Sequence, residues 1–125
     1  MNILLDSHAL LWALHAPERL APRARTAIRD ATNAVFFSAA SAWELEIKAA
    51  KGKLALPAEW LEVATGTGFR ELPVTSRVAR SAAHLEWYHT DPFDRMLVAQ
   101  ALERELHIAT RDNWISSYGV PVLVC

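Results

Sequence analysis

Short apolar runs alternate with helical patterns along this chain of 125 residues. The apolar runs have the length and composition of buried strands, and they predict strands at Asn2–Leu5, Ala34–Phe37, Phe69–Val74, His107–Ala109 and Val120–Val124. Between them, apolar residues recur three or four positions apart, as on the buried face of a helix. This spacing predicts helices at Ser7–His15, Pro22–Ala31, Ser38 or Ser41 to Lys51, Pro57–Ala64, Ser76–Leu85, Asp91 through Leu102, and Asp112–Ser117.

Helix boundaries are marked by proline, glycine and acidic residues. Pro17 is expected to stop the first helix, and Pro22 suits the first turn of the next. Gly52 is expected to end the helix after the second strand. The clearest start is Asp91-Pro92, because aspartate is a good N-cap and proline a good first helical residue.

Strands that alternate with helices predict an α/β fold, with a mainly parallel sheet in the middle layer of a three-layer α/β/α sandwich. The length suits one domain over residues 1–125. In open parallel sheets, ligands bind beyond the carboxyl ends of the strands. The strand-to-helix junctions are therefore the places to search for chemistry.

Composition excludes several classes of site. Cys125 is the single cysteine, so neither an internal disulfide nor a cysteine-pair zinc site can form. The first six residues lack a basic region, and no apolar stretch approaches membrane-spanning length, so we expect a cytoplasmic protein. The net charge of −1 does not itself indicate a nucleic-acid partner. The arginines from Arg19 to Arg29 are interpreted as a solvated helix face.

Acidic residues occur at junction after junction. Of the five aspartates, Asp6 follows the first strand, Asp91 and Asp94 begin the long helix, and Asp112 follows the fourth strand. Glu44 lies early in the helix after the second strand. Because these positions belong to the same edge of a parallel sheet, their side chains are expected to converge.

Each acid also has a purely structural interpretation. Asp6, Asp91 and Asp112 could be N-caps. Asp94 could be an acid in the first helical turn that is stabilised by the helix dipole, and Ser41 with Glu44 fits a capping box. Together, however, converging carboxylates would repel one another, and a divalent cation would remove that cost. Mg²⁺ prefers oxygen ligands, and such a site can activate water to hydrolyse a phosphodiester.

The order and spacing of several segments resemble the PIN domain family, in particular the VapC-type toxins of bacterial toxin–antitoxin modules. The resemblance covers essentially the whole chain. The matching segments are Leu4–Trp12, Ser38–Glu44, Lys48–Leu54, His89–Ala101 and Thr110–Asp112. It implies a five-stranded sheet of order 3-2-1-4-5.

The resemblance also implies that Asp6, Glu44, Asp94 and Asp112 form the catalytic and metal-binding quartet. Asp6 and Asp94 would be the most direct ligands of Mg²⁺, with Mn²⁺ as a possibility. The implied activity is hydrolysis of RNA phosphodiesters with water as the nucleophile. The implied partners are an RNA substrate, a cognate VapB-like antitoxin and a second copy in a homodimer, and no membrane. Asp91 is placed outside the quartet, because its N-cap role already explains it.

Polar neighbours of the quartet have weaker assignments. Ser7, Thr110 and Asn113 could support the carboxylates. Arg95 and Arg111 could meet RNA phosphate or damp the repulsion, although surface ion pairs would explain them equally. For the imidazoles of His8 and His89 we favour packing or loop-stabilising roles, and for Trp114 packing, over direct roles in the site.

Two other functions remain open from the residues alone. One is phosphoryl transfer through Asp6 as an aspartyl nucleophile, although haloacid-dehalogenase-like enzymes place a second aspartate where this chain has His8. The other is a non-catalytic domain that binds RNA or protein; four acids in the cleft would disfavour RNA binding without a cation. Dinucleotide binding is poorly supported, because Gly66 and Gly68 lack a third glycine and do not follow the first strand.

Overall fold

A computed structural model describes residues 1–125 and shows one five-stranded parallel sheet of order β3-β2-β1-β4-β5. This confirms the predicted α/β class and the strand order that the resemblance implied. The strands are β1 (Asn2–Leu5), β2 (Ala34–Ser38), β3 (Arg70–Leu72), β4 (His107–Thr110) and β5 (Val122–Val124).

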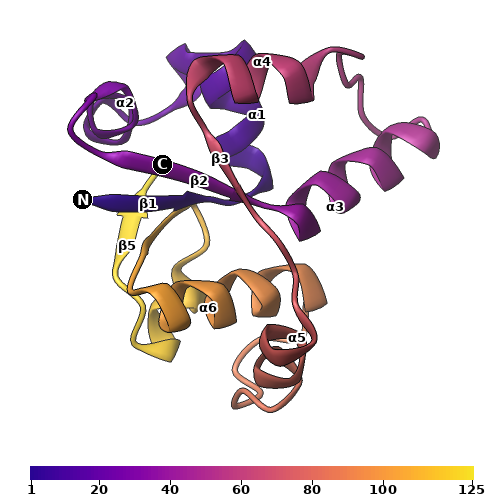
Figure 1. Cartoon of the computed structure of the whole chain (residues 1–125), viewed down its shortest axis with the longest axis vertical. Helices are drawn as coiled ribbons and strands as arrows, with labels where there is room; N and C mark the ends of the chain where they lie inside the picture. The colour runs from indigo at the N-terminus through magenta and orange to yellow at the C-terminus, as the bar shows by residue number, and fades with distance from the viewer.

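Helices cover both faces of the sheet (Figure 1). They are α1 (Ser7–His15), α2 (Pro22–Arg29), α3 (Ala39–Ala50), α4 (Trp60–Thr67), α5 (Ser76–Ala83) and α6 (Pro92–Arg104), with short 3₁₀ helices η1 (Pro17–Arg19) and η2 (Asn113–Tyr118). One face is covered by α1, α2 and α4, and the other by α6, which has α5 packed on its outer side. None of these helices is long and apolar enough to cross a membrane.

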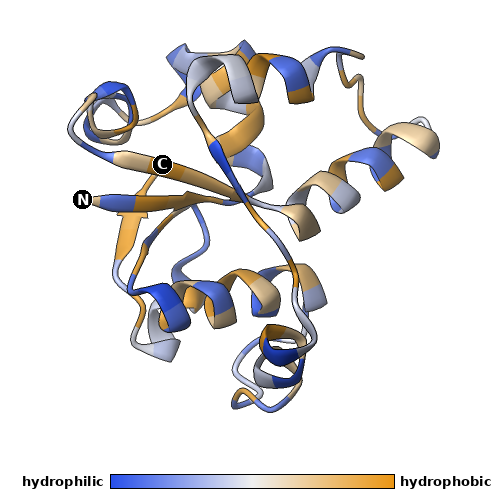
Figure 2. Cartoon of the chain, in the orientation of Figure 1, coloured by the Kyte–Doolittle hydropathy of each residue, from blue (hydrophilic) through white to orange (hydrophobic).

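The two hydrophobic cores follow from the alternation of side chains along β1. Ile3 and Leu5 point to the face covered by α1 and α2, whereas Leu4 points to the face covered by α6. All three are fully buried. In Figure 2 the strands are mostly orange, while the helices alternate between blue and orange as expected of elements with one solvated face.

Strand register aligns the carboxyl ends of the three central strands. Leu5 pairs with Phe37 of β2 and with Ala109 of β4. The next residue, Asp6, donates its backbone N–H to the carbonyl of Ala109 at 3.1 Å. Chain segments about a hundred residues apart in sequence therefore deliver their junction residues to the same edge.

Local differences from the predicted elements have identifiable causes. Ser38, not Ser41, caps α3, because its Oγ accepts from the backbone N–H of Ala40. Ser41 is buried inside that helix, so the capping box with Glu44 does not form. Helix α4 begins at Trp60 and continues past Gly66 to Thr67, and β3 covers only three residues.

The segment 84–91, which joins α5 to α6, is held by the buried guanidinium of Arg95. Its Nη1 donates to the carbonyls of Glu86 at 3.0 Å and His89 at 3.1 Å, and its Nη2 to those of Ala82 and Leu85, both at 2.8 Å. Only 3% of Arg95 is exposed. The sequence-based interpretation of Arg95 as an RNA-facing residue or a surface ion pair is therefore wrong. Its guanidinium instead donates hydrogen bonds to main-chain carbonyls.

We expect Arg95→Leu to destabilise the protein by about 3 kcal/mol, because four carbonyls would each lose a hydrogen bond in a partly dry environment. Arg104→Leu, at an exposed position of the same helix, is the matched control and should change stability by less than about 0.5 kcal/mol. Urea denaturation followed by circular dichroism measures both. Equal stability of the two variants would show that the guanidinium does not hold the segment.

Candidate functional site

The four predicted acids, together with Asp91, line one polar cavity at the carboxyl edge of the sheet. Its volume is about 400 Å³. None of its lining residues is hydrophobic: they are Asp6, Ser7, His8, Glu44, Lys48, Asp91, Asp94, Thr110, Arg111 and Asp112. The predicted convergence of acids that are distant in sequence is therefore present in the structure.

Asp6 is placed by the end of β1 and by the start of α1. Its Oδ1 accepts from the backbone N–H of Ala9 at 2.8 Å, so it is the N-cap of α1. Burial raises the pKa of the Asp6 carboxyl, although the cap bond and the hydroxyl of Thr110 act in the opposite direction. A desolvated carboxylate of this kind gains from a nearby cation.

Glu44 projects from α3 and is held on both of its oxygens. The hydroxyl of Ser7 donates to Oε1, and Lys48 Nζ lies 3.2 Å from Oε2. Ser7 thus has the supporting role that the sequence suggested, whereas Lys48 was not singled out. Its spacing of four residues from Glu44 on a predicted helix was the signal that could have found it.

The first turn of α6 contributes two aspartates with different tasks. Asp91 Oδ1 accepts from the backbone N–H groups of Phe93 at 2.8 Å and Asp94 at 3.1 Å, which makes it the predicted N-cap. The Asp94 carboxylate takes no part in these bonds, and its Oδ2 forms a hydrogen bond with His89 Nε2 at 2.7 Å. Asp94 is therefore not needed as a cap.

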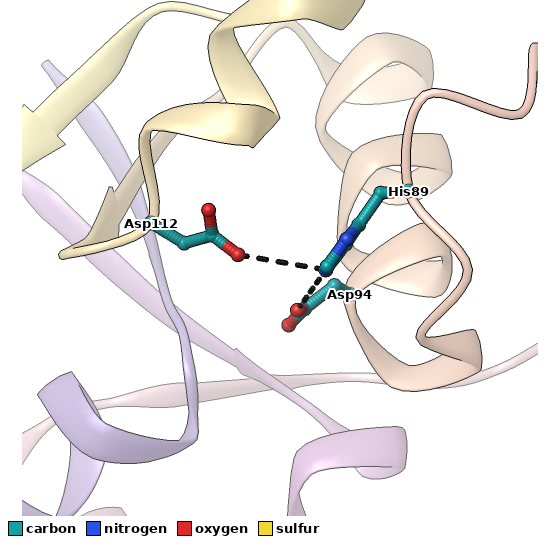
Figure 3. A group of neighbouring side chains, drawn as sticks. All are labelled: His89, Asp94 and Asp112. Carbon is teal, nitrogen blue, oxygen red and sulfur yellow. Dashed lines mark hydrogen bonds and ion pairs between the residues drawn. The ribbon is translucent and has the colours of Figure 1, made fainter.

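His89 joins Asp94 to Asp112, as Figure 3 shows. Its Nε2 also lies 3.5 Å from Asp112 Oδ2, while Asp112 Oδ1 accepts from the backbone N–H of Trp114 at 2.9 Å. The sequence favours a packing or loop-stabilising role for His89, whereas in the structure its ring contacts two of the four acids. The tight spacing of His89, Asp91 and Asp94 in the sequence was the available signal.

Burial and crowding raise the pKa of the Asp94 carboxyl from 3.8 to about 6. Desolvation is the main cause, the negative charges of Asp91 and Asp6 add to it, and the hydrogen bond from His89 opposes it. The side chain is 26% exposed. Ionised Asp94 is thus costly in the protein alone, as expected of a group that awaits a positive partner.

Other candidates are placed as follows. Thr110 accepts from the backbone N–H of Asp112 at 3.0 Å and lines the cavity. The guanidinium of Arg111 also lines the cavity and lies 5.1 Å from the ring of Trp12. Asn113 begins η2, outside the cavity lining, and Trp114 is exposed.

The residues present suit a divalent cation. One ligand atom from each of His89, Asp94 and Asp112 can be chosen so that all lie within 4.8 Å of one another. Asp6 and Glu44 add carboxylates to the same cavity. Carboxylate oxygens are the ligands of Mg²⁺ and Mn²⁺, and carboxylates that are desolvated and crowded, as Asp6 and Asp94 are, favour binding a cation.

Comparison with known proteins places this fold and site in context. The family model described as PIN domain matches residues 3–120. Ribonuclease VapC22 of Mycobacterium tuberculosis (strain ATCC 25618 / H37Rv) is 32% identical over 124 residues, covering 96% of this chain and 94% of the relative.

Solved structures share the fold at low sequence identity. A chain of VapBC2 from Rickettsia felis, solved with a DNA fragment from the promoter, has a TM-score of 0.67 at 8% identity and covers 99% of this chain and 98% of its own. A chain of FitAcB from Neisseria gonorrhoeae has a TM-score of 0.62 at 24% identity, covering 97% and 96%. A family model that spans nearly the whole chain and a relative at 32% identity show that this chain belongs to the PIN domain family.

Proposed function

We propose that this chain is a divalent-metal-dependent endoribonuclease and the toxin of a toxin–antitoxin pair. The single observation that supports this most is the convergence of Asp6, Glu44, Asp94 and Asp112 on one polar cavity. The VapC22 relative is named a ribonuclease, which indicates RNA as the substrate. We propose Mg²⁺ as the physiological ion, with Mn²⁺ as the alternative.

Each acid has a distinct role in this proposal. Asp6 and Asp94 would hold the ion directly, and Asp112 would complete its ligand set. Glu44, fixed by Ser7 and Lys48, would orient the attacking water and accept its proton. When bound, the ion supplies Lewis-acid activation of the water and stabilises the leaving oxygen of the phosphodiester.

The cationic side chains at the cavity suit a phosphate backbone. Arg111 lines the cavity next to Asp112 and offers a planar guanidinium. Lys48, on α3, also lines the cavity. Together they would draw a phosphate towards the carboxylates, which would otherwise repel it.

We expect Asp94→Asn and Asp6→Asn to keep the fold and to lower RNA cleavage by at least about 100-fold, because each removes a charged ligand. Asp30→Asn is the matched control, since Asp30 is exposed and far from the cavity lining. Cleavage of labelled RNA is measured with Mg²⁺, with Mn²⁺ and with EDTA. Full activity of either site variant, or activity in EDTA, would contradict the proposal; binding of RNA without cleavage would favour a non-catalytic domain.

Removal of the Asp94 charge should also stabilise the metal-free protein. The folded pKa is about 6 and the unfolded value 3.8, so the folded chain holds this proton more tightly. The resulting stabilisation is complete below pH 3.8 and disappears as the pH rises through 6. At pH 7.5 in EDTA, Asp94→Asn should therefore be more stable than the wild type by about 1–2 kcal/mol.

Thermal denaturation at pH 7.5 tests this. Added Mg²⁺ or Mn²⁺ should raise the Tm of the wild type and have less effect on Asp94→Asn, because only ligands bound by the native state stabilise it. The pKa of Asp30 is lowered by its bonds to Thr32, so Asp30→Asn should not stabilise the protein. If Asp94→Asn had a lower Tm than the wild type in EDTA, the ionised Asp94 carboxylate would not destabilise the metal-free protein.

We further propose that a VapB-like antitoxin binds the cavity through a segment with a cationic side chain, because the cavity is lined by five acids. Expression of the chain should slow bacterial growth, and co-expression of the product of a short adjacent reading frame should restore it. Asp94→Asn, expressed alone, should not slow growth. Growth inhibition equal to that of the wild type by this variant would separate toxicity from the site.

A further inference from the structure

The imidazole of His89 contacts two of the carboxylates that are proposed to hold the ion. Its Nε2 is 2.7 Å from Asp94 Oδ2 and 3.5 Å from Asp112 Oδ2. Neighbouring ligands of a six-coordinate ion with bonds of about 2.1 Å are about 3 Å apart. The two measured distances bracket that value, so the imidazole nitrogen and the two carboxylate oxygens can face one ion (Figure 3).

The backbone of His89 is fixed on both sides. Its N–H donates to the hydroxyl of Tyr118 at 3.0 Å, and its carbonyl accepts from Arg95 Nη1 at 3.1 Å. Tyr118 also donates to the carbonyl of Glu86 at 2.8 Å. A surface ion pair needs no such support, whereas a ligand gains affinity when its position is set before the ion arrives.

We propose that His89 is a nitrogen ligand of the ion held by Asp94 and Asp112, and that it raises the affinity of the site for Mn²⁺ relative to that for Mg²⁺. This rests on the proposed function only in assuming that the cavity binds a divalent ion. A site of carboxylates alone suits Mg²⁺, which favours oxygen and keeps several waters. An imidazole suits transition-metal ions, and Mn²⁺ accepts both oxygen and nitrogen donors.

The gain in Mn²⁺ affinity relative to Mg²⁺ should disappear when the imidazole of His89 is removed. In His89→Ala, water can replace the ring around Mg²⁺ at little cost, whereas Mn²⁺ loses its nitrogen donor. We expect the ratio of Mn²⁺ to Mg²⁺ affinity to fall by roughly 10-fold or more. His84→Ala is the matched control, because His84 belongs to the same segment, is exposed, and points its Nδ1 at the carbonyl of Arg80.

Two measurements on the full chain test the inference without reference to cleavage. Isothermal titration calorimetry at pH 7.5 gives the affinities for MnCl₂ and MgCl₂. Electron spin echo envelope modulation of bound Mn²⁺ detects a ¹⁴N nucleus within bonding distance. The wild type, His84→Ala and His8→Ala should all show the nitrogen coupling, and His89→Ala should lack it. His8→Ala is included because the imidazole of His8 belongs to a residue that lines the cavity.

The outcomes separate the alternatives. Nitrogen coupling that persists in His89→Ala, or that is lost in His8→Ala instead, would overturn the assignment while leaving the metal site intact. Tighter binding of both ions by His89→Ala would also overturn it, because His89 would then be a counter-ion that competes with the metal. If the wild type binds neither ion at millimolar concentration, the inference and the metal dependence of the proposed function are both wrong.

Discussion

The burial and crowding of carboxylates at the carboxyl edge of the sheet is the constraint on which this structure depends. Strand register forces Asp6 and the residues around Thr110 to the same edge, and the first turn of α6 brings Asp94 to them. Burial is the main cause of the raised pKa values of Asp6 and Asp94, and the charges of neighbouring carboxylates add a smaller part. A cation bound among these carboxylates would offset the free-energy cost of keeping them ionised, and its binding would therefore stabilise the folded protein.

Polar side chains outside the acidic cluster fix the main chain around the site. The buried Arg95 satisfies carbonyls of the segment before α6, and Trp87 stacks on its guanidinium with 3.6 Å between the guanidinium carbon and the ring centroid. Tyr118, at the end of η2, forms hydrogen bonds with the same segment. Leu85 and Tyr88 of this segment add apolar contacts, and the polar bonds to the backbone of His89 fix where that residue lies.

The sequence allowed prediction of the fold to a considerable depth, for a simple reason. The buried residues of a strand such as β1, Ile3–Leu5, form an unbroken apolar run. A helix start such as Asp91-Pro92 is recognised from the two residues themselves, whatever the rest of the fold. Strand order was implied only by the resemblance, because it depends on contacts between distant segments. Arg95 was misjudged for the same reason: its partners are carbonyls, which every residue has, so no pattern of side chains reveals them.

Helix capping and a role in the cavity are not alternatives for the acids at the strand-to-helix junctions, because one side chain can do both. Asp6 and Asp112 each use Oδ1 for the cap bond, which leaves the second oxygen clear of the helix and, in Asp112, facing His89. The cap bond fixes the carboxylate plane before any ligand arrives. Asp94 needs no such bond, because Asp91 already caps its backbone N–H. The two aspartates at the start of α6 therefore have different roles. Asp91 caps the helix, and this leaves the carboxylate of Asp94 free to face the cavity.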